Sequence, residues 1–384
     1  MPSLADPATG IRPTDTTLHG VVVRGATDVA KLAAAWRALF LADTDARPYL
    51  HPAFNLRPMV LSRRHEVPLC LTIETESRQL VGLLPLVIAT RRNGPLRRKV
   101  LLPMAVARSP SFGCLAAPGY SDIVAERLAE MLAVLTAELD EIDLRFFRPN
   151  ARLGPAIIKQ GCLQWEMNPE PAVGSQFDGV LAWQELVGGH ARRNIGRRRR
   201  NLEEAHPDLR IDAVEPGPDF GTWAKRFQAL YSERNRTRGW TDGYGLGREA
   251  PDYPAVLEAM VRDGAASLYA IRFGDTLVAA EILGHVGEFT HSLATVYDPE
   301  WSSAGPGVML HSVVLQEMIA RGFRTFNFGL RPDAYKMQWA NWTEPTLRIF
   351  WERHSLAVRL VDRLGALRDR LRDAQPTARN PAEE

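Results

Sequence analysis

Residues 301–339 of this 384-residue chain read WSSAGPGVMLHSVVLQEMIARGFRTFNFGLRPDAYKMQW. The Gly-Pro-Gly triplet at 305–307 predicts a turn, followed by a helix over 308–321 and a strand over 325–330. A helix N-terminus presents free backbone N–H groups and the positive end of the helix dipole, which suit a phosphate or pyrophosphate. Glycine lets the backbone approach a ligand where a Cβ would collide. The stretch therefore predicts an anion site, although similar turns cap many helices that bind nothing.

The rest of the second half predicts an α/β unit. A helix over 220–236 precedes a hairpin of strands 267–273 and 276–284, whose Gly274-Asp275 loop fits a type II′ turn. A third strand is predicted over 289–297.

The first half repeats this order of hairpin, loop, helix and strand, which predicts an internal duplication without visible sequence identity. Its predicted elements are a strand at 20–24, helices at 28–41 and 51–61, a hairpin of 68–74 and 80–89, a loop at 103–121, a helix at 122–139 and a strand at 142–146.

The bulk composition is that of a globular protein. Apolar residues make up 45% and charged residues 24% of the chain, and its length suits two domains. The expected division is a flexible lead-in at 1–19, a first domain at 20–168, a second at 169–353 that opens on a polar Pro/Gly linker at 169–175, and a tail at 354–384. The formal net charge is only +2, so nothing overall demands a polyanionic partner.

The tail begins with an amphipathic pattern of leucines at 356, 360, 364, 367 and 371. This predicts a helix that docks on the parent domain, or else on a partner or membrane surface. No run of about 18 apolar residues predicts a transmembrane helix. The N-terminus lacks a secretory pattern, so a cytoplasmic location is the default expectation. Cys70, Cys114 and Cys162 have no metal-ligand spacing and are expected to be reduced, buried thiols.

Four stretches resemble a known family. They are VGLLPL at 81–86, the arginine-rich segment 190–202, the Gly-Pro-Gly turn with its helix, and Tyr335-Lys336-x-x-Trp339. From about residue 20 to 350, the chain resembles the GNAT-type N-acetyltransferase superfamily. More closely it resembles the CelD-type branch associated with cellulose and exopolysaccharide clusters, which is similar to the Fem-type double-GNAT aminoacyltransferases. The implied fold is α/β, with two GNAT-like domains in tandem, each a mixed, mainly antiparallel sheet flanked by helices.

The resemblance implies acetyl-CoA, or another acyl-CoA, as co-substrate and no metal. Its pyrophosphate loop falls on Ser302, Ser303, Ala304, Gly305, Pro306 and Gly307, with Val308 opening the helix. Ser302 stands where the family has Arg or Gln, and Asn327 stands where the branch commonly has an acidic residue. No Gly-x-Gly turn precedes Asp122 in the first half, so a single acyl-donor site is implied, in the second half.

The implied reaction is direct attack of an amine or hydroxyl on the thioester. Tyr335 matches the family position that protonates the departing thiolate, and a phenol with a pKa near 10 suits this role. Lys336 matches the Fem-type position that supports developing negative charge. The alternatives are a packed tyrosine and a solvated lysine. Glu281 and His291 are candidate bases, because each is an ionisable residue within an apolar strand. A water-facing strand and a structural histidine would explain them equally.

The arginine run places Arg193, Arg197 and Arg200 on one face of a predicted helix. Guanidinium groups bind phosphate bidentately, so this face is a candidate to hold a nucleotide-linked sugar, a lipid phosphate or CoA phosphates. Solvated charge is the alternative. These arginines and Trp339 are the predicted substrate-binding residues.

The resulting hypothesis is acyl transfer to a small-molecule or sugar-derived acceptor, such as a cell-envelope or exopolysaccharide precursor. The rivals are a Fem-type transferase that uses aminoacyl-tRNA and a non-catalytic module that binds nucleic acid or an anionic surface. The small net charge argues against nucleic acid. The sequence does not determine the oligomeric state.

Overall fold

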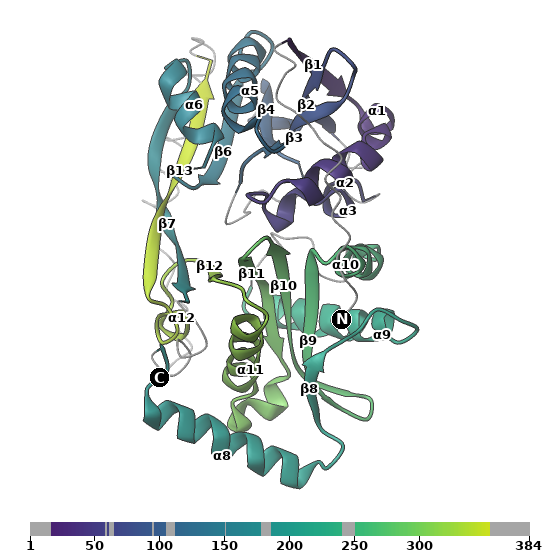
Figure 1. Ribbon diagram of the computed structural model, residues 1–384, viewed down its shortest axis with the longest axis vertical. Coiled ribbons are helices and arrows are strands. Elements are labelled where there is room, and N and C mark those ends of the chain that lie inside the picture. Colours follow the sequence, from purple (N-terminus) through teal and green to yellow (C-terminus); the bar gives the residue numbers. More distant parts are fainter. Residues whose placement is uncertain are drawn as a thin grey trace, which may run out of the picture.

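The computed structural model describes residues 17–57, 60, 65–93, 96–104, 112–149, 151–177, 186–239 and 250–353. The predicted helix in the tail lies outside the described residues, as does most of the lead-in. The described strands form one sheet of 13 strands in the order β1-β2-β3-β4-β6-β13-β7-β12-β11-β10-β9-β8, with β5 paired to β3. Figure 1 shows the two halves of the chain one above the other, with β7 and β13 running along one side of both.

The strands are mostly those that the alternation of apolar residues predicts, and β11 and β12 have the predicted bounds. The strands are β1 (Leu18–Arg24), β2 (Glu66–Thr75), β3 (Leu80–Asn93), β4 (Leu96–Pro103), β5 (Leu115–Ala116), β6 (Glu141–Phe147), β7 (Gln164–Gln176), β8 (Arg210–Ala213), β9 (Ala266–Phe273), β10 (Thr276–Val286), β11 (Phe289–Tyr297), β12 (Thr325–Leu330) and β13 (Trp342–Glu352).

The helices lie on both faces of the sheet. They are α1 (Ala26–Lys31), α2 (Ala33–Ala42), α3 (Pro52–Asn55), α5 (Ser121–Leu135), α6 (Leu153–Gln160), α8 (Gly189–Ala205), α9 (Phe220–Thr237), α10 (Tyr253–Arg262), α11 (Pro306–Ala320) and α12 (Ala334–Met337), with 3₁₀ turns η1 (Pro48–Leu50) and η2 (Pro299–Ala304). Of the stretch 51–61, where one helix was predicted, the described residues 51–57 are helical over Pro52–Asn55, and α6 and α10 were not predicted.

The predicted duplication of element order is confirmed. The first half runs β2, β3, β4, α5, β6, and the second runs β9, β10, β11, α11, β12. In each half the strands on either side of the long helix are parallel neighbours, β4 with β6 and β11 with β12. The Gly274-Asp275 turn joins β9 to β10 with Gly274 at φ +47°, as a type II′ turn requires.

The two halves exchange strands. The end of β7 pairs with β12 of the second half, while the end of β13 pairs with β6 of the first. The segment 169–175, expected as a linker, is therefore part of a central strand. Gly174 is needed there because an added Cβ would overlap the Trp342 ring and the Phe326 carbonyl oxygen. A glycine that indicates flexibility in the sequence serves close packing in the fold. The division at residue 168 remains a prediction.

Polar contacts hold the halves together on both sides. Across the exchanged strands, Arg348 binds Asp143 of β6 and Glu166 of β7 at 2.7 and 2.9 Å. On the other side, His51 Nε2 lies 3.1 Å from an oxygen of Asp263, which also pairs with Arg37. These contacts couple the halves through charge as well as through the continuous sheet.

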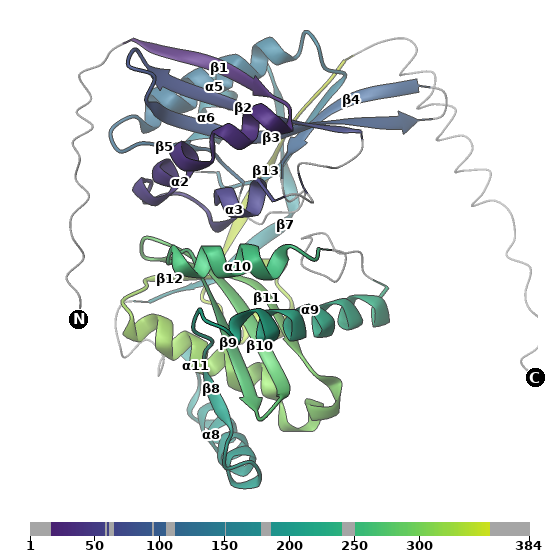
Figure 2. The ribbon, with the colours of Figure 1, turned by 90° about the vertical axis from the view of Figure 1, so that its right-hand side faces the viewer.

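The second half buries both faces of its sheet. Phe220, Trp223 and Phe227 of α9 pack on one face, with the side chains of Ala280 and Ile282. The next residues along β10 point to the opposite face, where α11 packs. Figure 2 shows α9 and α10 in front of these strands and α11 beside them. Among the three cysteines, Cys70 and Cys114 are buried as expected, but Cys162 is exposed.

Candidate functional site

The N-terminus of α11 has the geometry that the sequence predicts. Gly305 adopts φ +66°, a left-handed conformation that glycine adopts without strain, and Pro306 occupies the first helical position. The Met309 N–H donates to the Gly305 carbonyl oxygen. The N–H groups of Gly307 and Val308 have no backbone acceptor among the described residues. The helix start therefore offers two free donors and a positive dipole end.

A guanidinium group lies directly beside this turn. An added Cβ on Gly305 would overlap Nη1 of Arg198, which comes from α8. Ile195 and Leu202 pack from the same face of α8 onto the core around α11, so Arg198 is carried inward between them. Sequence reasoning missed Arg198, although its spacing of three and four from two apolar residues marks the inward face.

The predicted pyrophosphate loop is only partly enclosed. Ser302 and Ser303 are exposed in η2, Ala304 and Gly307 are half-buried, and Val308 is 37% exposed. A Cβ on Gly307 would touch only the Tyr297 ring, at 3.5 Å. The left-handed backbone conformation therefore favours glycine at 305, whereas the protein has room for a side chain at 307.

The predicted substrate arginines lie on the other face of α8. Arg193, Arg197 and Arg200 are exposed, and none forms an ion pair with another described residue. Arg197 donates to Asn194 at 3.1 Å, one turn earlier in the same helix. The fold thus separates this outer face from the turn that Arg198 reaches.

Strands β11 and β12 part close to the middle of the sheet. Their parallel pairing covers only three positions, ending at His291 and Asn327. Beyond that point β12 shifts register against β7, and Asn327 Oδ1 accepts the N–H of Gly329 at 2.6 Å. Asn327, which stands where the resemblance gives an acidic residue, therefore holds the bend that turns β12 away from β11. The opening lies on the side toward which both parallel strands run, where α11 begins.

A buried carboxylate and a histidine meet beside this opening. Glu281 of β10 is fully buried, and its oxygens contact Ser292 Oγ at 2.7 Å and His311 Nδ1 at 3.0 Å. Ser292 lies next to a bulge in β11, where Leu293 is the extra residue opposite β10. A charged group removed from water needs such partners, because an isolated buried carboxylate is very costly. Glu281 is therefore inside the protein, not on a water-facing strand.

His311 joins α11 to this opening. Its ring is enclosed by Phe326, Phe328 and Trp339, with ring centroids 5.1–5.4 Å away. Its side chain keeps 11% exposure, and Nε2 has no hydrogen-bond partner in the described part of the chain. A carboxylate at Nδ1 favours the tautomer with its proton there, which leaves Nε2 as an acceptor. Sequence reasoning missed this role, since nothing in the α11 pattern pairs His311 with Glu281.

Tyr335 lies on α12, after β12. The residue is 62% exposed, yet the pKa of its phenol is raised to about 12, first by desolvation and then by the carboxylates of Asp333 and Glu281. Arg234 and Arg238 lower it in part. Glu281 thus acts on Tyr335 through its charge, and the membership of both residues in one site remains a prediction.

Lys336 and Trp339 are both buried. Lys336 Nζ donates to the carbonyl oxygens of Leu330 and Arg331 and pairs with Asp333 at 3.0 Å. Burial lowers its pKa, while Asp333 opposes that shift. Lys336 thus fixes the turn that carries Tyr335. The Trp339 ring lies against His311, in the wall of the site rather than on its surface.

His291 points away from the other candidates. Thr290 contacts Met318 of α11, so the next residue of the strand faces the opposite side of the sheet. There His291 is fully buried beside Tyr49 of the first half, and neither ring nitrogen has a hydrogen-bond partner among the described residues. Burial and the nearby Arg47 and Arg148 hold its pKa well below the usual value. The structure does not bring His291 together with Glu281.

Comparison with known proteins supports the fold. Residues 189–337 match the acetyltransferase (GNAT) domain family. No curated protein matches the chain in sequence. The structure resembles FemX (9% identity, TM-score 0.56, covering 82% of this chain and 95% of that chain). It also resembles a conserved protein of unknown function from Bacteroides thetaiotaomicron (11% identity, TM-score 0.55, covering 84% and 97%).

A third resemblance is to the C-terminal domain of a protein from Agrobacterium fabrum that is designated as a lysylphosphatidylglycerol synthetase (12% identity, TM-score 0.56, covering 90% and 96%). At such identities the likeness shows the fold. The chain is an α/β protein with two GNAT-like domains in tandem, and the family match falls on its second half. Within the described residues, no helix has the length and apolar character needed to cross a membrane.

Proposed function

We propose that this protein moves an acetyl or other acyl group from acyl-CoA to an amine or hydroxyl. One observation carries the proposal. The opening between β11 and β12 has the cationic, N–H-rich start of α11 at its end and the buried Glu281–His311 pair at its side. The family match over 189–337 supports the same reaction class.

The donor phosphates would lie at the start of α11. The free N–H groups of Gly307 and Val308 and the Arg198 guanidinium face that point together. Arg198 would supply the cation that the family places where this chain has Ser302. Charge-assisted hydrogen bonds to phosphate are shorter and stronger than neutral ones. An acyl group extending into the strand opening would then approach His311, five residues further along α11, or ~7.5 Å along its axis at 1.5 Å per residue.

His311 would act as the general base. Its Nε2 accepts a proton from the attacking amine or hydroxyl as the new bond forms at the thioester carbonyl carbon. Glu281 holds the ring in the required tautomer and stabilises the imidazolium that results, and Ser292 Oγ orients Glu281. Glu281 is therefore a positioning residue in this scheme.

Tyr335 would complete the proton balance. When the carbon–sulfur bond breaks, the thiolate takes the phenol proton of Tyr335; solvent then returns a proton to Tyr335 and takes one from the His311 imidazolium. With its pKa raised to about 12, the phenol stays protonated throughout the neutral range, and the same shift makes it a weaker acid toward the thiolate. Lys336 would support this step by holding the turn beneath Tyr335.

The acceptor class is the less constrained part of the proposal. A sugar-derived, cell-envelope or exopolysaccharide precursor is inferred from the CelD-type resemblance. A Fem-type reaction with aminoacyl-tRNA as donor is the second candidate. It is favoured by the likeness to FemX and by the exposed, unpaired face of Arg193, Arg197 and Arg200.

Isothermal titration with acetyl-CoA tests the donor site. We expect the wild type to bind acetyl-CoA. Arg198→Gln should lose about tenfold or more in affinity, since one charge-assisted contact contributes ~1.5–3 kcal/mol. The matched control Arg193→Gln, on the outer face of α8, should bind as tightly as the wild type. Absence of binding at millimolar acetyl-CoA, or equal affinity of Arg198→Gln and wild type, would reject the site. Faster transfer from charged tRNA than from acyl-CoA would select the second candidate.

A further inference from the structure

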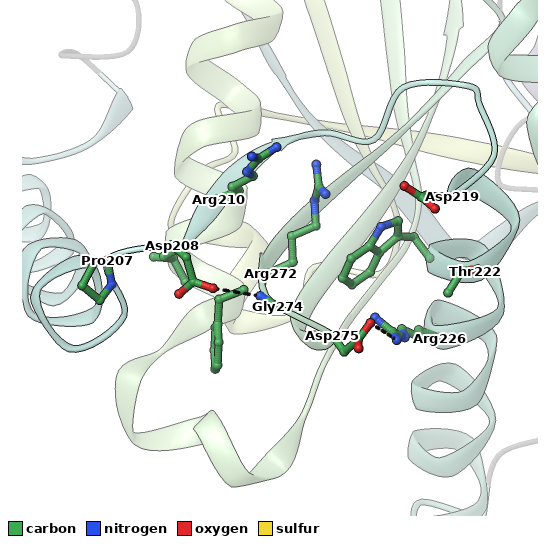
Figure 3. Close-up of a pocket in the computed structure, with 12 residues that line it drawn as sticks. Pro207, Asp208, Arg210, Asp219, Thr222, Arg226, Arg272, Gly274 and Asp275 are labelled. Carbon is green, nitrogen blue, oxygen red and sulfur yellow. Dashed lines mark hydrogen bonds and ion pairs between the residues drawn. The ribbon is translucent and has the colours of Figure 1, made fainter.

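A separate pocket lies at the edge of the second half. It has a volume of about 590 Å³, within the usual range for small-molecule sites. Residues of β8, the first turns of α9 and the β9–β10 turn line it, as Figure 3 shows. None of the residues of the proposed transfer site contributes to it, so an inference about it does not rest on the proposed function.

Three arginines and three aspartates line the pocket, namely Arg210, Arg226, Arg272, Asp208, Asp219 and Asp275. Two of these six charged groups are satisfied within the wall, since Arg226 pairs with Asp275 at 2.7 Å. Asp208 accepts the N–H of Gly274 at 3.1 Å. Arg210 and Asp219 form no hydrogen bond or ion pair through their side chains with any described residue. Among the described residues, the lining groups without a counter-ion are therefore one guanidinium, Arg210, and two carboxylates, Asp208 and Asp219.

Arg272 lies between Arg210 and Asp219 and is fixed in place. Its Nη2 donates to Asp212 at 2.9 Å, and its guanidinium lies 5.2 Å from the centroid of the Trp223 ring. Its Nε is buried and has no hydrogen-bond partner among the described residues. In Figure 3, the Arg210 and Arg272 side chains extend the same way, with Asp219 across the pocket from Arg210.

The arrangement selects a ligand with both charges. A purely anionic ligand would meet the Asp219 carboxylate, and a purely cationic one would meet Arg210 and Arg272. Like charges brought together destabilise a complex, while opposite ones orient it. Trp223, which also lines the pocket, adds an apolar surface for the body of the ligand.

We propose that this pocket binds a small zwitterion of about dipeptide size. Its carboxylate lies on Arg210 and Arg272, and its ammonium group lies on Asp219.

Titration with three matched peptides tests this proposal. The probes are alanylalanine, its N-acetyl derivative, which keeps only the negative charge, and its C-terminal amide, which keeps only the positive one. We expect the zwitterion to bind in the micromolar to millimolar range, and each blocked derivative to bind at least tenfold more weakly. Arg210→Gln and Asp219→Asn should each weaken the zwitterion by a similar factor, whereas Arg193→Gln should not.

Misfolding would not obscure this test. The Asp219 side chain makes no capping hydrogen bond to α9, and Arg210 is exposed, so both variants should keep the wild-type melting temperature. Three results would overturn the proposal. The first is no binding of alanylalanine at about 10 mM, a concentration at which even a millimolar Kd is detectable. The second is equal binding of alanylalanine and the blocked peptides. The third is loss of binding in His311→Gln, which would place the peptide in the transfer site.

Discussion

The two halves share the same arrangement of strands around a long helix, but they differ in the residues at the start of that helix and in the sheet beneath it. Both α5 and α11 have 15 residues, follow a glycine with positive φ, and connect strands that pair in parallel over only two or three positions. The starts of the two helices differ. Asp122 lies in the first turn of α5, where it neutralises the helix dipole and repels an anion. The first turn of α11 has no acidic residue and lies beside Arg198.

The sheets beneath the two helices differ as well. In the first half, β3 buries Val81, Leu83 and Leu84, whereas β10 buries Glu281. The sixth residue of α5, Glu126, pairs with Lys159 at the surface, while the sixth residue of α11, His311, contacts Glu281 inside. The fold gives both halves the same short parallel pairing, and under the proposed function a few side chains give the second half alone its anion site and its proton acceptor.

The largest expected effect comes from removing the residues that have no counterpart in the first half. Glu281→Gln and His311→Gln should each lower kcat by ~10²–10⁴-fold, the range of general base catalysis. Glu126→Gln, at the equivalent position of α5, should leave kcat unchanged. Steady-state kinetics on folded variants measures this. Rates within a few-fold of wild type would exclude the pair from proton transfer and remove the difference between the halves.

Acid sensitivity should also differ between the halves. Burial lowers the pKa of His51 to about 4 and that of His285 to about 3, and it holds His291 well below its usual value. The unfolded chain therefore binds more protons than the folded protein below pH ~6.5, so stability falls as the pH drops from there toward 4. His51 alone, which joins the two halves, should contribute a loss of about 3 kcal/mol at pH ~4.

Urea denaturation between pH 7 and pH 4, with His51→Gln beside the wild type, measures this contribution. The variant should lose less stability than the wild type over that interval. Hydrogen exchange should show amides of the second half opening first, because two of the three buried histidines lie there. A pH-independent stability would contradict the expected neutral state of these rings in the folded protein.

The smallest effect should come from the two glycines that precede the long helices. Gly305→Ala and Gly119→Ala both place a side chain at positive φ, which costs ~1–2 kcal/mol of stability. Only Gly305→Ala also displaces Arg198, so it alone should weaken donor binding, by about tenfold. Denaturation and titration of both variants separate the two effects. Equal loss of donor affinity in both would show that Arg198 is not a ligand.

Several parts of the fold could be read from local patterns. The hairpin at Gly274, the bounds of β11 and β12 and the repeated element order depend on turn chemistry and side-chain periodicity, which neighbouring residues express. Strands β4 and β13 were not predicted, because charged residues interrupt them. The partners that bury β13 are β6 and β7, almost 200 residues earlier in the chain. Gly174 was misread for the same reason, since Trp342 makes it necessary.

The candidate site likewise has features that follow from local sequence and features that depend on contacts between distant residues. The sequence determined the turn at Gly305 and the helix after it, because backbone freedom and helix ends depend on adjacent residues. It also marked Glu281 as an ionisable group in an apolar strand. Only the tertiary structure decided that His311 and Ser292 are its partners, that Arg198 rather than Arg193 faces the turn, and that His291 lies on the other side of the sheet. Hydrogen bonds and charge pairs depend on distances of a few ångströms, and folding alone brings residues from different elements that close.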